Sequence, residues 1–236
     1  MAASAFNIYT AAKTSILNGG LNVATGTFVA ILVSATYTPN LPTDSTYANV
    51  SANEVTGTGY TTGGVVLTGA ALSLYLASVS IASGGTAYTQ ADVGKVITLT
   101  GGTFTTAATI SITQVNGGTG TGPVTGISLL TGGTYSVDPA NPASGTGSTA
   151  GSGLTINGIY GTQLFENNPS WSTATITAKY LVILNRAAGA LVAGDKLLGY
   201  IDLNTASTSS TVSSTSGTFT VQFNSGSTGG TLFSLV

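Results

Sequence analysis

The sequence has 236 residues but no cysteine and no histidine, and only 5% of its residues are charged. Without cysteine, the chain forms no disulfide and no thiolate metal site. An average soluble domain carries about 25% charged residues, and that charge usually keeps a free monomer in solution. We therefore expect a protein with a polar, uncharged surface that is packed permanently against neighbouring subunits.

Positive charge is especially scarce. The few dispersed cations cannot neutralise a run of phosphates, so we expect no nucleic-acid binding and no docking on an anionic membrane. No apolar run approaches the roughly eighteen residues of a membrane span, and the start of the chain lacks the features of a secretory signal. These features predict synthesis and assembly in a cytoplasm. The five cations are Lys13, Lys95, Lys179, Lys196 and Arg186.

One segment, residues 7–18, has the pattern of a helix. Its apolar residues recur every four positions from Ile8 to Ile16, which gives a single apolar stripe. We expect Asn7 to cap the start of this helix, and the glycine pair beginning at Gly19 to supply the left-handed conformation that ends it.

The rest of the sequence is typical of β-structure. Short apolar or alternating runs are separated by turns rich in glycine, serine and threonine, with no second helix, and this favours an antiparallel sandwich. The proline-containing segment 35–51 is expected to be a surface loop. The expected strands are 27–34, 65–76 with a break at Gly69, 171–184 as one strand, 197–203, and 217–224.

Between these strands the composition changes. Glycine and threonine dominate from about residue 78 to 153, where short strands are expected. Gly84-Gly-Thr-Ala-Tyr88 is echoed by Gly132-Gly-Thr-Tyr135, and each motif is followed by an aspartate, which suggests two copies of a small β unit. Residues 140–153 are close to low complexity and are expected to form a flexible loop.

These patterns predict an all-β protein with one N-terminal helix. Residues 1–76 and 156–236 are expected to form a discontinuous β-sandwich base domain. Residues 77–155 are expected to form a small inserted β domain, because a long insertion at a loop adds little closure entropy.

Several segments resemble small structural proteins of tailed bacteriophages. The resemblance starts with a helix, an Asn-Gly-Gly turn and the buried run FVAILVSATYTPN at 28–40, followed by NEVTGTGYTTGG at 53–64. It continues in WSTATITAKYLVIL at 171–184, LLGYIDL at 197–203 and SGTFTVQFN at 216–224.

The resemblance covers roughly residues 5–76 and 160–226. It implies a virion component, with the decoration or cement proteins of capsids as the first choice, and it transfers no catalytic residue. The segment 77–155 departs from the shorter family members and is similar to the Gly-Gly-x-x-Tyr β repeats of phage tail fibres and other virion appendages.

Asp92 and Asp138 are the candidates for acid–base catalysis. They follow the two Gly-Gly motifs at similar distances, and paired catalysis requires that both carboxylates converge in one cleft. The alternative, which we favour, is that each aspartate anchors a turn by accepting backbone hydrogen bonds.

Other candidate sites are weaker. The glycine-rich segment 117–126 lacks the following helix and the lysine of a phosphate loop. Residues 151–155 lack the second glycine of a nucleophile elbow, and without histidine only a lysine is available to activate a serine or threonine. Trp171 either stacks on a sugar or, more commonly, belongs to a core or interface. Asn49 begins a formal glycosylation motif that has little meaning in a bacterial product.

We expect no catalytic, cofactor-binding or metal-binding residue; a calcium ion held by backbone carbonyls and one aspartate is the only metal site left open. The expected function is a non-enzymatic capsid decoration protein that bridges major capsid subunits on the virion surface, as a homo-oligomer, most simply a trimer. One alternative is a tail or fibre protein whose insert binds host glycans. Another is a carbohydrate-active enzyme that uses Asp92 and Asp138.

Overall fold

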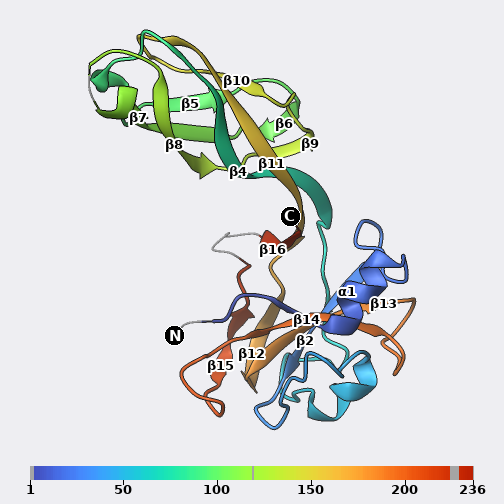
Figure 1. Cartoon of the computed structure of the whole chain (residues 1–236). Coiled ribbons are helices and arrows are strands. Elements are labelled where there is room, and N and C mark those ends of the chain that lie inside the picture. The colour runs from blue at the N-terminus through green and yellow to red at the C-terminus, as the bar shows by residue number, and fades with distance from the viewer. Residues whose placement is uncertain (1–2, 119, 224–228, 236) are drawn as a thin grey trace. The chain divides into compact units, whose positions relative to one another are not determined.

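The computed structural model describes residues 3–118, 120–223 and 229–235 (Figure 1). The protein is all-β with one α-helix and several antiparallel sheets, as the sequence predicts. Its contacts divide it into two compact units. The base unit comprises Met1–Ala71 and Leu164–Phe233, and the insert unit comprises Leu72–Gln163 with Ser234–Val236.

The base unit is built on a five-stranded antiparallel sheet in the order β1-β14-β13-β2-β3. At its centre, β2 and β13 pair along their whole length, from Tyr180 opposite Val33 to Arg186 opposite Thr27. The expected buried strand at 27–34 is confirmed, because every residue of β2 after Thr27 is buried. The strands are β1 (Asn7–Ile8), β2 (Thr27–Val33), β3 (Val65–Val66), β13 (Tyr180–Arg186) and β14 (Lys196–Asp202).

A second, two-stranded sheet covers the same core. It consists of β12 (Ser170–Ala178) and β15 (Val212–Thr220). Trp171, Ile176 and Phe219 on its inner face belong to one buried cluster with the central strands of the larger sheet. The two sheets therefore form a sandwich around a shared apolar core.

The prediction of a single strand at 171–184 is wrong, because the chain forms two strands here. β12 ends at Ala178 and β13 begins at Tyr180, in a different sheet. The break falls at Lys179, whose backbone N–H donates to Val33 O at 2.9 Å. The last expected strand, 217–224, also starts earlier and ends earlier than predicted, since β15 ends at Thr220; Asn224 lies outside the described residues.

The N-terminal helix is shorter than expected. α1 spans Thr10–Leu17, and Asn7 does not cap it, because Asn7–Ile8 instead pairs with β14 as β1. The residue before the helix is Tyr9, which is fully buried and makes no side-chain cap bond. The expected left-handed end is confirmed by Gly19, with a φ of 73°.

The insert unit contains a longer sheet in the order β6-β9-β4-β11-β10-β5-β7-β8, with β16 (Gly229–Leu235) also paired to β11. β4 and β11 are long strands that cross the unit boundaries, so the contact division falls at Leu72 and Gln163, outside the expected limits of 77 and 155. The break at Gly69 is confirmed, with a φ of 78° between β3 and β4. The strands are β4 (Ala71–Thr86), β5 (Val96–Leu99), β6 (Thr103–Thr106), β7 (Thr109–Val115), β8 (Val124–Thr131), β9 (Thr134–Val137), β10 (Ala143–Thr146) and β11 (Ser152–Asn167).

The sheet of the insert unit curls on itself. Leu76 N donates to Gly132 O at 2.8 Å, and Tyr88 and Gly122 exchange two backbone hydrogen bonds, so β4 also lies along the segment that contains β8. The enclosed side chains, among them Ile110 and Ile112, form a second buried cluster that is separate from the core of the base unit.

The prediction of a flexible loop at 140–153 is wrong. β10 lies within it and pairs with both β5 and β11. Its small residues are required by close packing: a Cβ atom on Gly145 would lie 2.5 Å from Ile97 Cγ2. The low-complexity composition therefore reflects strand packing rather than disorder.

The expected surface loop at 35–51 lacks a regular strand, but part of it forms a turn of 3₁₀-helix. The described residues include four 3₁₀ segments of three residues each, the last of which is interrupted by the positive φ of Gly117. They are Tyr47–Asn49, Ser51–Asn53, Gln90–Asp92 and Asn116–Gly118.

Candidate functional site

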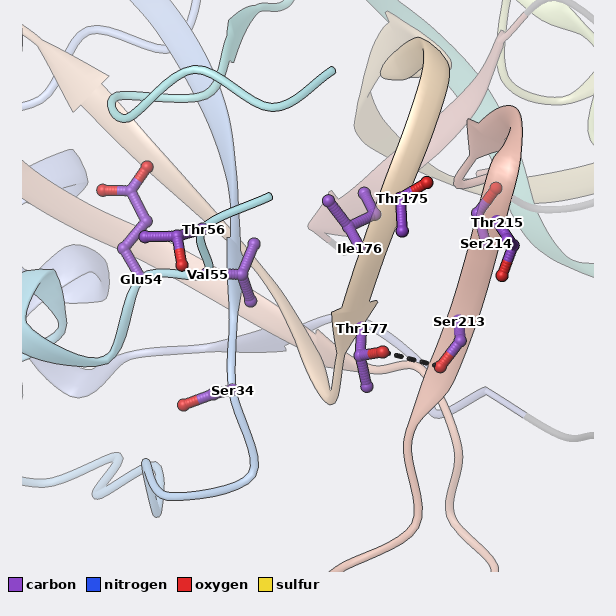
Figure 2. Close-up of a pocket in the computed structure, with 10 residues that line it drawn as sticks. All are labelled: Ser34, Glu54, Val55, Thr56, Thr175, Ile176, Thr177, Ser213, Ser214 and Thr215. Atoms are coloured by element: carbon purple, nitrogen blue, oxygen red, sulfur yellow. Dashed lines mark hydrogen bonds between the residues drawn. The ribbon is translucent and has the colours of Figure 1, made fainter. Parts of the chain in front are cut away.

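The base unit contains an open groove of about 570 Å³ between the end of β2 and the β12–β15 sheet. Figure 2 shows the ten residues that line it. Ser34, Glu54, Val55 and Thr56 lie on one side, and residues 175–177 of β12 with 213–215 of β15 lie on the other.

The groove exists because the segment after Asn53 is divided between two partners. Its first part pairs with β2: Glu54 bridges Val33, and Val55 N donates to Leu32 O at 2.9 Å. A few residues later it reaches β12, where Thr175 N donates to Thr58 O at 2.9 Å. The segment therefore lies apart from the part of β12 that follows Thr175, and the groove lies between the two.

Most of the lining residues are serine or threonine. Thr177 Oγ1 and Ser213 Oγ lie 2.8 Å apart across the β12–β15 pair, as the dashed line in Figure 2 shows. Ser216 N donates to Thr175 Oγ1 at 3.0 Å. Val55 and Ile176, both buried, form the apolar part of the lining. The groove thus combines an apolar floor with a rim of hydroxyl groups.

Glu54 is the one ionisable residue of the lining, and its carboxylate is already occupied. Tyr47 OH donates to Oε2 at 2.5 Å, while Tyr60 OH and Gly63 N donate to Oε1 at 2.6 and 2.7 Å. Burial, followed by the hydrogen bond to Glu54, raises the pKa of Tyr60 well above its usual range. Glu54 therefore stabilises its own loop and offers no free carboxylate to a ligand.

No protein family, curated protein or solved structure matches this chain. The chemistry of the groove must therefore be inferred from its own residues. Hydroxyl groups both donate and accept hydrogen bonds, and the ten lining residues include no cation. Such a lining is suited to a neutral, polar ligand.

Asp92 anchors a turn, as the favoured alternative predicts. Its buried carboxylate accepts from Thr89 N at 2.8 Å and from Ala150 N at 3.0 Å, and it pairs with Lys95 at 3.0 Å. The hydrogen bond from Thr89 N is the main factor that holds the pKa of Asp92 far below its usual range, with Ala150 N and Lys95 contributing. All these partners are structural, so the carboxylate is not available as a proton donor.

Asp138 has different surroundings. Within the described part of the chain, its Oδ1 is buried without a hydrogen-bond partner, and burial raises the pKa of Asp138. Burial and then the charge of Asp138 raise the pKa of Tyr160, whereas the carboxylate of Asp92 is bonded to Thr89, Ala150 and Lys95. Asp138 therefore does not show the turn-anchoring bonds expected of it, and the two aspartates have no partner in common.

Trp171 is a core residue, so the interpretation as an exposed sugar-stacking ring is wrong. It is 4% exposed and packs between Tyr60 and Phe219, with ring centroids 5.9 and 6.0 Å away. Asn49 also has a structural role, since its Oδ1 accepts from Ser45 N and Thr46 N at 3.0 Å each.

The glycine-rich segment 117–126 is a hairpin connection, as its turn residues suggest. Gly117, Gly118 and Gly120 all have positive φ, and the segment leads from β7 into β8 rather than into a helix. Thr119 lies outside the described residues. The elbow-like residues 151–155 enter β11.

Three of the four lysines are engaged. Lys95 pairs with Asp92, Lys179 pairs with Asp202, and Lys196 Nζ donates to Gly20 O at 2.7 Å. Within the described part of the chain, no group of three or more acidic residues is placed to hold a metal ion. The described helices include none that is long and apolar enough to cross a membrane.

Sequence reasoning did not identify the groove. Thr175 and Thr177 of β12 are exposed while Ile176 is buried, so the threonines of this strand form one exposed face. The groove itself depends on where the segment 54–58 diverges from β12, and no local pattern encodes that divergence.

Proposed function

We propose that this chain is a non-enzymatic structural protein of a tailed-phage virion, and that it binds the outer surface of the head as a decoration protein. It would bridge neighbouring major capsid subunits as a homo-oligomer, most simply a trimer at threefold positions. Repeated modest contacts in a symmetric assembly sum to tight binding.

The observation that supports this proposal most strongly is how little charge remains on the surface. The sequence has only twelve Lys, Arg, Asp and Glu residues, five basic and seven acidic. Folding then buries five of them: Asp44, Asp92, Glu166, Lys179 and Asp195. A surface so poor in charge costs little to desolvate, which favours lasting contact with other subunits over free solubility.

Rebinding to capsids tests the proposal. Purified protein should bind capsids that lack it and raise the temperature at which they disassemble, since a ligand that binds only the intact shell stabilises it. Capsids that already carry the protein are the control and should bind none. Failure to bind the bare capsids at saturating concentration would contradict the proposal.

Imaging of the particle distinguishes the head from the tail. Density for this chain on the head surface supports decoration. Density on the tail or its fibres instead supports the alternative of an appendage protein whose insert, residues 77–155, binds host glycans.

A further inference from the structure

One peptide bond of the insert unit joins an aspartate to a proline, and the sequence contains no second Asp-Pro pair. Asp138 and Pro139 lie in the connection between β9, which ends at Val137, and β10, which begins at Ala143. The bond to proline is a tertiary amide. Its nitrogen accepts a proton more readily than that of an ordinary peptide bond, and it leaves as a secondary amine when the bond breaks. Acid should therefore break this bond before any other peptide bond of the chain.

The carboxyl group of Asp138 is free to react. Its Oδ1 is buried, and the carboxyl makes no hydrogen bond with any described residue. A buried polar atom without a partner is rare in folded proteins and requires a functional or structural explanation. The one unengaged aspartate is thus the one that precedes proline. The other aspartates each accept a hydrogen bond: Asp44, Asp92, Asp195 and Asp202.

The backbone at this bond is held in place by the turn that precedes β6. A Cβ atom on Gly102 would lie 2.8 Å from Pro139 N and 2.9 Å from Asp138 C, so the turn packs directly on the atoms of the bond. Pro139 is buried, whereas Asp138 is half-buried and within reach of water. Rotation of one side chain can therefore bring a carboxyl oxygen of Asp138 to its own carbonyl carbon while the chain stays in place. Such a fixed arrangement raises the effective concentration of the reacting groups.

The surroundings of Asp138 favour the protonated carboxyl. Burial raises the pKa of Asp138. The titratable groups of this neighbourhood are Tyr160 of β11 and Tyr135 of β9, and neither can supply a positive charge to hold the carboxyl ionised. The Gly-Gly turn before β6 carries no titratable side chain. The carboxyl therefore keeps its proton in weaker acid than an ordinary aspartate does, and this proton can be transferred to the nitrogen of Pro139.

We propose that the protein cleaves its own chain between Asp138 and Pro139 in mildly acidic solution. A carboxyl oxygen of Asp138 forms a bond to the carbonyl carbon of the same residue, and the carboxyl proton passes to Pro139 N. The C–N bond then breaks, which leaves a cyclic anhydride at Asp138 and a free secondary amine at Pro139. One water molecule opens the anhydride to the two carboxyl groups of a C-terminal aspartate, and no other reactant is consumed.

The fold tolerates a break at this position. β9 is paired with β4 and β6, and β10 with β5 and β11, so each strand beside the cut keeps its partners. The two fragments, residues 1–138 and 139–236, should therefore remain associated until the protein is unfolded. The cut lies within the insert unit and does not depend on the proposed role in a capsid.

Incubation of the full-length protein at pH 5 tests the proposal. Denaturing electrophoresis and mass spectrometry should show the two fragments accumulating over several days, with masses that add up to that of the intact chain plus one water molecule. Size-exclusion chromatography of the same sample should still show one folded species. The absence of fragments, cleavage at another bond, or cleavage that protease inhibitors prevent would overturn the proposal.

The unfolded chain separates the effect of the fold from the ordinary acid sensitivity of the bond. At pH 5 in concentrated denaturant, the Asp138 carboxyl has the pKa of a free aspartate, about 4, and is largely ionised. Folded protein should therefore be cleaved at least threefold faster than unfolded protein at the same pH. An equal or faster rate in denaturant would show that the fold contributes nothing, and the proposal would be wrong.

Three substitutions identify the reacting groups. Asp138→Glu keeps the carboxyl but requires a ring one atom larger, and Pro139→Ala restores an ordinary peptide bond, so each should slow cleavage at least tenfold. Val137→Ala, at an exposed neighbouring position, is the matched control and should be cleaved within about twofold of the original rate. Asp138→Glu is the decisive variant if Pro139→Ala fails to fold. Cleavage of Asp138→Glu at the original rate would show that this side chain does not attack the bond.

Discussion

The side chain of Lys179 pairs with Asp202 at 2.8 Å although it has no exposure to solvent. Its ammonium also donates to the carbonyl oxygens of Asn204 and Ser207 and lies 5.6 Å from the centre of the Tyr180 ring. Lys179 is the residue at which the chain leaves one sheet of the base unit and enters the other. A single buried cation therefore joins both sheets to the loop that follows β14.

Replacing Lys179 by methionine should lower the free energy of unfolding by about 3 kcal/mol, because it leaves Asp202 and two backbone carbonyls without their partner. Asp202 is partly exposed, which places the loss at the lower end of the range for buried pairs. Lys13→Met, at an exposed helix position, is the control and should change stability by no more than about 0.5 kcal/mol. Equal effects in chemical denaturation would refute a structural role for the pair.

Glu166 predicts a dependence of stability on pH. It is fully buried, neither carboxylate oxygen has a hydrogen-bond partner among the described residues, and burial raises the pKa of Glu166 from 4.5 to about 7. The folded state therefore retains the proton longer than the unfolded chain. The contribution of Glu166 to the free energy of unfolding is fully present below about pH 4.5 and is lost as the pH rises to about 7. The free energy of unfolding should fall by at most about 3 kcal/mol over this range.

Glu166→Gln isolates this effect, because the glutamine cannot ionise. The difference in unfolding free energy between the variant and the original protein should increase in favour of the variant from pH 4.5 to pH 7 and then stay level. Denaturant titrations at four or five pH values measure it. A difference that stays constant with pH would show that Glu166 does not titrate in this range.

The two Gly-Gly motifs predict matching sensitivity to substitution. Gly85 and Gly133 have φ values of 65° and 70°, and an added Cβ would lie 2.2 Å from Ser152 O or 2.6 Å from Ala108 N. Alanine at either position should destabilise the insert unit by about 2 kcal/mol or more, from backbone strain and the clash together. Gly94 also has a positive φ but nothing within 4 Å of the added atom.

Gly94→Ala is therefore the control for strain without a clash, and thermal unfolding should show a smaller loss than for Gly85→Ala or Gly133→Ala. If all three variants lose the same stability, the close backbone contacts at the two motifs contribute nothing.

Local patterns predicted the elements that depend on few neighbours. The continuous apolar run from Phe28 to Val33 forms the buried centre of the larger sheet, and Gly19 and Gly69 end or interrupt elements because glycine tolerates positive φ. The same reasoning failed at Asn7, where pairing with β14 competes with helix capping. It also failed at Lys179, whose ion-pair partner is more than twenty residues away in the sequence.

From its composition and periodicity alone, the chain was bound to be β-rich, poor in charge and stabilised by apolar strands, since these properties follow from short-range chemistry. Which strands share a sheet, where the segment 54–58 leaves β12 to open the groove, and why Glu166 lacks a partner were decided by the tertiary structure. The reason is that a strand's alternation specifies which face is buried, whereas its partner and the gaps beside it depend on contacts between residues far apart in the chain.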